Sequence, residues 1–264
     1  MILLGVVSLL GSGAQAAPPQ RVISLDYCAD QYVLTFVPRA HILAVSPDAD
    51  APFSYMRDAA RGLTKIRPRA EDVLIAQPDL IVRSYGGGPN AAALFTRAGV
   101  PVLTATPAHN LAGVRQTTLD MAAALGQAEH GIAVVADMDR RLAALKAQRP
   151  PRTALYVTPS GWTSGPGSLM DAMLQAAGLA NFQRQPGWRS LPLERLAYER
   201  PQLIAAAFFD HAAPHLANWG AMRHPVARAQ IRDVPTVFLS GAWVACGGWF
   251  LVDAIEALAK APAP

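Results

Sequence analysis

The chain has 264 residues, of which 52% are hydrophobic, 16% are charged and 7% are aromatic. This composition excludes a disordered chain and a coiled coil, and two cysteines are too few for a disulfide-framed scaffold or a four-thiolate zinc module. The net charge is +4, but the basic residues are scattered, with no run longer than Arg140 and Arg141, so we expect no nucleic acid among the partners.

The first 17 residues have the pattern of a secretory signal peptide. An apolar run over 2–10 is followed by small residues, and the sequence Ala14-Gln15-Ala16-Ala17 predicts cleavage near Ala16 or Ala17. The run is far shorter than the roughly 20 residues of a membrane span, so we do not expect the protein to cross a membrane. No Lys or Arg precedes the run, which leaves a buried N-terminal strand as the alternative. A signal peptide predicts export to a bacterial periplasm, where both cysteines meet an oxidising environment.

Short apolar strands alternate with helices in the first part of the chain. We predict strands over 21–25, 41–45, 80–82 and 100–104, and helices over 27–37, 70–76 and 91–98. Strands that alternate with helices at this spacing predict βαβ units and a parallel sheet.

The pattern changes at residue 111 and returns after residue 150. Residues 111–150 have helical spacing and no strand signal, with Gly126 among their weak points, and Pro150 and Pro151 end the segment. Beyond them we predict strands over 154–157, 203–209 and 237–239, and helices over 169–177, 192–199 and 250–259.

These elements predict an α/β fold with two Rossmann-like parallel-sheet lobes joined by one long rigid α-helix. The expected organisation is a signal peptide over 1–17, an N-terminal lobe over 18–110, a connecting helix over 111–150 and a C-terminal lobe over 151–264. An internal repeat supports two lobes, because the segment 70–82 recurs as 193–205 at an offset of 123 residues. In both copies a Glu (Glu71 and Glu194) stands seven residues before a Pro, and an apolar strand follows.

Two such lobes predict a ligand cleft between them. Ligands of parallel sheets bind beyond the carboxyl ends of the strands, and domain interfaces favour small-molecule pockets. The loops that leave the predicted strand ends are rich in aromatic residues, which combine a large apolar face with a polar handle. The alternative for each aromatic is that it plugs the end of a sheet. The candidate ligand-binding residues in these loops are Tyr27, Cys28, Phe53, Tyr85, Trp162, Asp210, Trp243 and Trp249.

No enzyme signature is present. The segment 158–162 is not a Gly-x-Ser-x-Gly elbow, and Gly86-Gly87-Gly88 lacks both the dinucleotide-binding spacing and a P-loop Lys. We therefore expect no enzyme, no catalytic residue, no metal-ligating residue and no resident cofactor. Two histidines, His211 and His215, have the spacing of paired metal ligands on a helix, but Pro214 lies between them. A zinc-binding transport protein and an adaptor without a ligand remain as alternatives.

The chain resembles the class III periplasmic binding proteins, which deliver vitamin B12, ferric siderophores or haem to ABC importers. The resemblance covers residues 21–260 and is carried by Arg21–Leu25 with Cys28–Gln31, the Glu71…Pro78-Asp79-Leu80 pattern, Thr163-Ser164-Gly165, Glu194…Pro201-Gln202-Leu203 and Cys246-Gly247-Gly248. It implies two α/β lobes joined by a single helix, a monomer in the periplasm, a small-molecule metal chelate as ligand and the permease dimer of an ABC importer as partner.

Within this family, the segments 162–165 and 188–194 are most similar to vitamin B12 binders, which implies a corrinoid ligand with Trp188 against it. Ala242 stands where some B12 binders have an acid before the Trp of the last cleft loop, so a ferric siderophore or haem remains the alternative. The resemblance also implies that Glu71 and Glu194 meet arginines of the two permease subunits. The alternative for both is a carboxylate favoured by its place in the first turn of a helix.

The two cysteines, Cys28 and Cys246, lie in the first and last cleft loops, one in each predicted lobe. A disulfide between them requires Cα atoms within about 7 Å. Free thiols beside the ligand, one of them a metal ligand, and two small buried residues are the other possibilities at this point.

Overall fold

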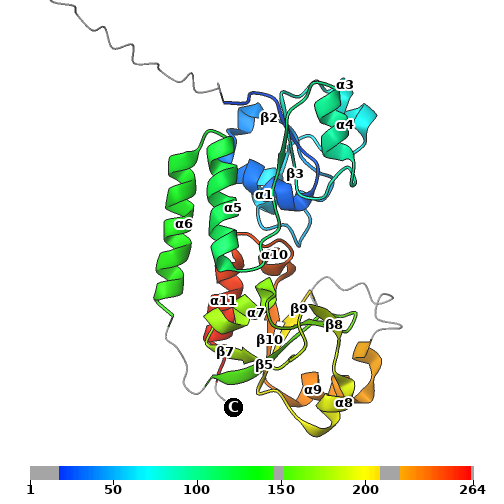
Figure 1. Cartoon of the computed structure of the whole chain (residues 1–264), viewed down its shortest axis with the longest axis vertical. Helices are drawn as coiled ribbons and strands as arrows, with labels where there is room; N and C mark the ends of the chain where they lie inside the picture. The colour runs from blue at the N-terminus through cyan, green and yellow to red at the C-terminus, as the bar shows by residue number, and fades with distance from the viewer. Residues whose placement is uncertain (1–17, 146–150, 209–220, 263–264) are drawn as a thin grey trace, which may run out of the picture.

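The computed structural model describes residues 18–145, 151–208 and 221–262, and it contains two α/β lobes stacked along the long axis of the molecule (Figure 1). The predicted fold class is confirmed. The predicted signal peptide over 1–17 lies outside the described residues.

The N-terminal lobe is built on a four-stranded parallel sheet in the order β2-β1-β3-β4. Its strands are β1 (Val22–Ser24), β2 (Ile42–Ala44), β3 (Leu80–Arg83) and β4 (Val102–Thr104), and its helices are α1 (Tyr27–Phe36), α2 (Arg57–Ala60), α3 (Ala70–Ile75) and α4 (Ala91–Arg97). Successive strand residues alternate between two cores: Val22 and Val82 join the core that contains α1, and Ile23 joins the core that contains α3 and α4. Both faces of the sheet are therefore covered, as a parallel sheet requires.

The C-terminal lobe repeats this plan with a parallel sheet in the order β10-β9-β5-β7. Its strands are β5 (Arg152–Val157), β7 (Leu179–Asn181), β9 (Leu203–Ala207) and β10 (Thr236–Leu239), and its helices are α7 (Leu169–Ala176), α8 (Leu193–Tyr198), α9 (Pro225–Asp233), α10 (Gly241–Val244) and α11 (Leu251–Ala259). A separate two-stranded antiparallel sheet pairs β6 (Trp162–Ser164) with β8 (Trp188–Ser190), and α7 and β7 lie between these strands in the chain. Helices α7 and α11 cover one face of the parallel sheet, and α8 and α9 cover the other.

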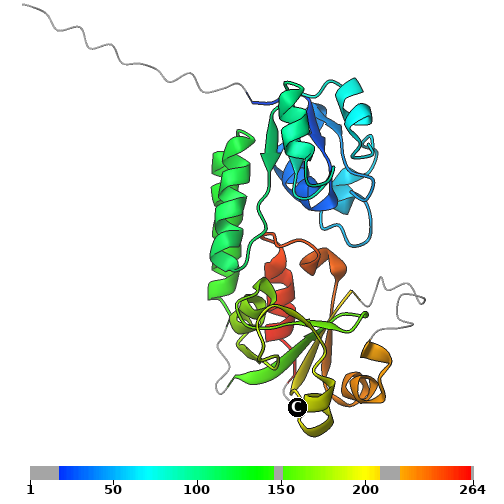
Figure 2. The same ribbon diagram turned by 45° about the vertical axis from the view of Figure 1, so that its right-hand side comes forward.

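The connection between the lobes differs from the single helix that we predicted. It consists of two helices, α5 (Leu111–Ala124) and α6 (Ala128–Ala143), which run antiparallel and lie side by side in Figure 1. The turned view shows them along one side of the molecule (Figure 2). The break lies at Gly126, whose positive φ of 75° ends α5 and turns the chain back. The two helices pack closely at Gly131, where an added Cβ would lie 2.4 Å from the Cβ of Ala122. Helical spacing and helix-forming residues continue through this turn, so only the glycine signals it.

Aromatic and charged side chains hold the lobes together beside this helix pair. Trp249, from the segment between α10 and α11, packs into the core of the N-terminal lobe, with its ring 5.5 Å from that of Tyr32. Tyr55 of the N-terminal lobe stacks on Phe250 with ring centroids 4.4 Å apart. Arg141 of α6 forms ion pairs with two carboxylates of α11. The two aromatic contacts cross from one lobe to the other, and the ion pairs of Arg141 fix the helix pair to the C-terminal lobe, so the lobes are held in one orientation by packing and not by the helix pair alone.

Candidate ligand-binding cleft

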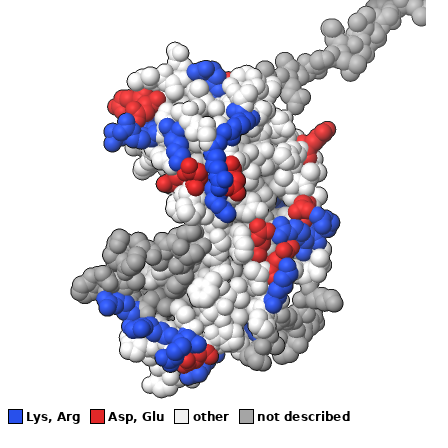
Figure 3. Space-filling view, turned by 180° about the vertical axis from the view of Figure 1, so that it is seen from behind, with Lys and Arg blue, Asp and Glu red and all other residues white. Residues whose placement is uncertain are grey.

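The carboxyl ends of both parallel sheets meet between the lobes. β1 and β3 end at this edge in the N-terminal lobe, and the segment that follows β10 and α10 approaches it from the C-terminal lobe. A cavity of about 250 Å³ lies at the meeting point. It is lined by Tyr27, Cys28, Tyr32, Ser84, Tyr85, Ala105, Thr106, Pro107, Ala245, Cys246, Gly247, Gly248 and Phe250. Seen from behind, the molecular surface is indented on one side between the two lobes (Figure 3).

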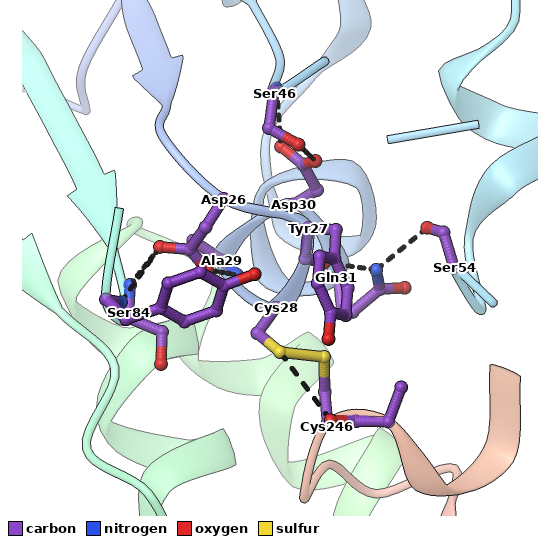
Figure 4. The surroundings of a disulfide bond; sticks show 12 residues. Asp26, Tyr27, Cys28, Ala29, Asp30, Gln31, Ser46, Ser54, Ser84 and Cys246 are labelled. Atoms are coloured by element: carbon purple, nitrogen blue, oxygen red, sulfur yellow. Dashed lines mark hydrogen bonds between the residues drawn. A yellow bond between two sulfur atoms is a disulfide. The ribbon is translucent and has the colours of Figure 1, made fainter. Parts of the chain in front are cut away.

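The N-terminal wall of the cleft is organised by the buried carboxylate of Asp26, which sequence analysis did not single out. Its Oδ1 accepts the backbone N–H of Ala29 at 2.9 Å and so caps α1. Its Oδ2 accepts the N–H groups of Ser84, Tyr85 and Gly86 at 2.7, 3.0 and 2.8 Å (Figure 4). One side chain therefore fixes both the start of α1 and the loop after β3. An Asp just before a helical pattern was the only sequence signal for the cap, and nothing in the sequence indicated the bonds to the second loop.

Gly86 is required at this junction for a steric reason. An added Cβ would lie 2.5 Å from the carbonyl oxygen of Leu25, so a larger residue would push the loop after β3 away from the strand end. The glycine thus permits the close approach that brings the loop within reach of Asp26.

Three aromatic residues that we predicted for the cleft gather on this wall. The ring of Tyr27 lies 4.9 Å from that of Phe53 and 6.0 Å from that of Tyr85, both in edge-to-face geometry. Burial raises the pKa of the Tyr27 phenol, and burial together with the neighbouring Tyr27 and Asp26 raises the pKa of Tyr85. Both phenols are therefore neutral at physiological pH and can donate hydrogen bonds. Tyr85 is 53% exposed, an unusual amount for a large aromatic residue, and its open face is available to a ligand.

Two further predicted aromatics, Trp162 and Trp188, lie on the two-stranded β6–β8 sheet of the C-terminal lobe and do not line the cavity. β6 follows the carboxyl end of β5, and β5 runs parallel to β9 and hence to β10, so the β6–β8 sheet lies at the same sheet edge as the loop of Cys246. Trp162 is opposite Ser190 and Ser164 is opposite Trp188. Directly opposed residues share a face, as do residues two apart, so both tryptophans lie on one face of this small sheet. They are 47% and 53% exposed, and the Trp188 ring also contacts Tyr156 edge to face.

The base of the cleft is closed by a disulfide bond between Cys28 and Cys246 (Figure 4). Their Cα atoms are 5.4 Å apart, within the range that a disulfide needs. The sequence left open a disulfide, free thiols and two small buried residues, and in the structure the two cysteines form a disulfide. The bond joins the first turn of α1 in the N-terminal lobe to the segment after α10 in the C-terminal lobe, and both cysteines line the cavity.

The remaining predicted ligand residues lie elsewhere. Trp243 packs against the core of the C-terminal lobe, and Trp249 packs against the core of the N-terminal lobe as described above. Neither lines the cavity between the lobes. Asp210, together with His211 and His215 of the zinc alternative, lies outside the described residues.

The two predicted docking carboxylates are both on the surface, one on each lobe. Glu71 is in the first turn of α3 and Glu194 is in the first turn of α8. Both are exposed, and within the described residues neither forms a salt bridge.

A second buried carboxylate, Asp30, stands behind the cleft wall and was also missed. It accepts a hydrogen bond from the Ser46 hydroxyl at 2.5 Å and another from the Ser46 backbone N–H at 3.1 Å. Burial raises the pKa of Asp30 to about 6, against the lowering effect of its hydrogen bonds. This group links α1 to the loop after β2 and does not line the cavity.

The electrostatic character of the cavity limits what it can bind. No described residue that lines it carries a charge, and its polar side-chain groups are the hydroxyls of Tyr27, Tyr32, Ser84, Tyr85 and Thr106, with nearby backbone. Among the residues that the structure describes, no three His, Cys, Asp or Glu side chains gather as metal ligands. The cleft is suited to an organic ligand with broad apolar faces and hydrogen-bonding groups at its edges.

No described helix combines the length and hydropathy of a membrane span.

Comparisons with known proteins agree with this geometry. Residues 36–207 match the family described as periplasmic binding protein. A solved periplasmic haem-binding protein, BhuT in complex with two haems, is 25% identical, with a TM-score of 0.67, over 91% of this chain and 98% of that chain. A periplasmic haem-binding protein from Pseudomonas aeruginosa has a TM-score of 0.72 at 21% identity, over 93% of this chain and 95% of that one. The periplasmic vitamin B12-binding protein BtuF of Vibrio cholerae has a TM-score of 0.65 at 18% identity, over 92% and 96%. No curated protein matches the sequence.

Proposed function

The chain belongs to the periplasmic binding protein family, and we propose that it captures a metal macrocycle in its cleft for delivery to an ABC importer in the cytoplasmic membrane. Members of this family bind solutes and are not enzymes. The observation that supports the proposal is the uncharged cavity at the meeting point of two sheet edges, flanked by exposed aromatic residues on both lobes.

A corrinoid is the ligand that we favour. Its edge carries neutral carboxamides, which suit the hydroxyl and backbone groups of the cavity, and its ring offers a wide surface to Tyr85, which lines the cavity. The exposed rings of Trp162 and Trp188, on the β6–β8 sheet of the other lobe, would extend this contact beyond the cavity. Burying the two carboxylates of haem would require cationic partners, and the described residues that line the cavity include no cation.

Haem is the second candidate. The observation that favours it is the similarity to the haem complex of BhuT, which at 25% identity extends over 91% of the chain. Haem would be held with its ring in the same cleft and its carboxylates directed outward to solvent.

Titration of intrinsic tryptophan fluorescence distinguishes these ligands. We expect cyanocobalamin to quench the purified protein saturably at one equivalent, and haemin and a ferric hydroxamate siderophore are titrated in parallel. A variant with Trp162→Ala and Trp188→Ala serves as the control for absorption of light by the coloured ligands, because it retains Trp243 and Trp249. Saturable quenching by haemin alone would select the second candidate, and the absence of saturable quenching by all three would overturn the proposal.

We further propose that Glu71 and Glu194 orient the protein on the permease dimer. They begin equivalent helices on the two lobes, and a partner with two related subunits can offer each of them the same basic group. The double variant Glu71→Ala/Glu194→Ala is expected to bind chelate normally and to support less uptake. The deficit should be largest at low salt, because salt screens such pairs. Normal uptake by the double variant would leave both residues as ordinary helix-terminus carboxylates.

A further inference from the structure

The two copies of the internal repeat fold into equivalent modules. In each lobe a six-residue helix, α3 or α8, precedes a central strand of the parallel sheet, β3 or β9. Figure 1 places α3 at the far end of one lobe and α8 at the far end of the other, both away from the α5–α6 pair. Val73 of α3 is fully buried and Leu196 of α8 is 3% exposed, so the inner face of each helix is explained by core packing.

The outer faces of these helices each present a large apolar side chain to solvent. Ile75, the last residue of α3, is 81% exposed, and Tyr198, the last residue of α8, is 92% exposed. These are the two highest exposures among the large hydrophobic residues that the structure describes. Their separation of 123 residues is the offset of the repeat, so they occupy corresponding positions in the two lobes.

Each of these residues shares a helix face with a predicted docking carboxylate. Ile75 follows Glu71 by four positions, and Tyr198 follows Glu194 by four positions, which is the spacing of neighbours on a helix surface. Each lobe thus displays one carboxylate next to one apolar side chain. A single exposed apolar residue needs no explanation, but the same pair at the same place in both lobes does.

We propose that Ile75 and Tyr198 are paired apolar anchors. Each inserts into a pocket of one subunit of the permease dimer, and the pocket lies beside the basic side chain that meets Glu71 or Glu194. The inference rests on the proposed function and adds a desolvated contact to each ion pair. Charged pairs at an interface mainly speed and orient the encounter, whereas buried aromatic and aliphatic anchors slow dissociation. If the two permease subunits are identical, each pocket has to accept a side chain as large as Tyr198.

Association of the purified protein with its permease tests this inference. Fluorescently labelled protein is added to spheroplasts of its own bacterium in which its gene has been deleted, and bound label is measured against protein concentration. The variant Ile75→Gln/Tyr198→Gln is expected to need about tenfold more protein for half-maximal binding. The loss should persist at high salt, unlike that of Glu71→Ala/Glu194→Ala.

A matched control is available on the α5–α6 pair. Ile132 of α6 is 61% exposed and has no counterpart in the repeat, so Ile132→Gln should bind spheroplasts like wild type. All variants are titrated with cyanocobalamin and haemin, which reports on the proposed function separately. Unchanged spheroplast binding by Ile75→Gln/Tyr198→Gln would overturn the inference, whatever the titration shows. It would also be overturned if wild type formed dimers in sedimentation velocity that the variant did not, because the partner would then be a second copy of this chain.

Discussion

The disulfide between the lobes should contribute a large part of the stability of the protein. The double variant Cys28→Ser/Cys246→Ser removes the bond and keeps two small polar residues at the base of the cleft. The bond joins positions separated by 218 residues, so its removal frees nearly the whole chain in the unfolded state.

The expected magnitude follows from the size of that loop. The loop-closure relation gives about 5 kcal/mol for a loop of this length. This is an upper value, because the unfolded chain retains some structure. The lobes of the variant remain associated in the native state through Trp249 and the Tyr55–Phe250 stack, so we expect a folded protein with a lower free energy of unfolding.

Urea denaturation followed by circular dichroism measures the effect. Wild type with a reducing agent should match the double variant without it, and the double variant should be insensitive to the reducing agent. Chelate affinity should change little, because packing still holds the two walls of the cleft. A double variant whose free energy of unfolding lies within about 1 kcal/mol of wild type would show that the bond does not constrain the unfolded chain.

Three further predictions concern the walls of the cleft. Asp26→Ala removes the acceptor of four backbone N–H groups and should lower the free energy of unfolding by about 2–4 kcal/mol and weaken chelate binding. Asp26→Asn should recover part of the stability and part of the affinity, which urea denaturation and ligand titration measure. The pKa of Asp30 is raised from 3.8 to about 6, so between these pH values the folded protein holds a proton that the unfolded chain releases. The free energy of unfolding should therefore fall as pH rises from about 4 to about 6. Asp30→Asn should abolish this pH dependence when urea denaturation is repeated at each pH. Trp162→Ala and Trp188→Ala should each weaken chelate binding by about 2 kcal/mol in calorimetry, whereas Tyr198→Ala, which removes a still more exposed aromatic far from the cleft, should not. Wild-type affinity in both tryptophan variants would refute the assignment of the β6–β8 sheet to the cleft.

Most strands of the two parallel sheets were predictable from the sequence because they contain an apolar run. Strands β3 and β9 and the helices before them were found in this way, and their repetition indicated two lobes before any geometry was known. Strand β7 and helix α9 were not predicted, and neither was the antiparallel β6–β8 sheet. Its second strand is Trp188–Ser190, three exposed residues with no apolar alternation, and only pairing with β6 makes it a strand.

The candidate site was predictable only in part. Loops that leave parallel strands lie at one edge of a sheet, so Tyr27, Phe53, Tyr85 and Trp162 could be selected from position alone, whereas Trp188 was selected through the resemblance to vitamin B12 binders. Which loop aromatics face the cleft depends on packing between the lobes, and Trp249 shows why sequence position is insufficient: it lies in a cleft-edge loop yet fills the core of the other lobe. The bonds from Asp26 to the loop after β3 join residues about 60 positions apart, and no local pattern encodes such a contact.

Hydrogen–deuterium exchange tests whether both lobes contribute to one binding site. Exchange of the intact disulfide-bonded protein is compared with and without saturating cyanocobalamin, and separately haemin. A site shared by both lobes predicts slower exchange on ligand binding in two places at once, the loop 84–88 of the N-terminal lobe and the strands 162–164 and 188–190 of the C-terminal lobe, with α5 and α6 unchanged. Protection confined to one lobe, or located on α5 and α6, would contradict it.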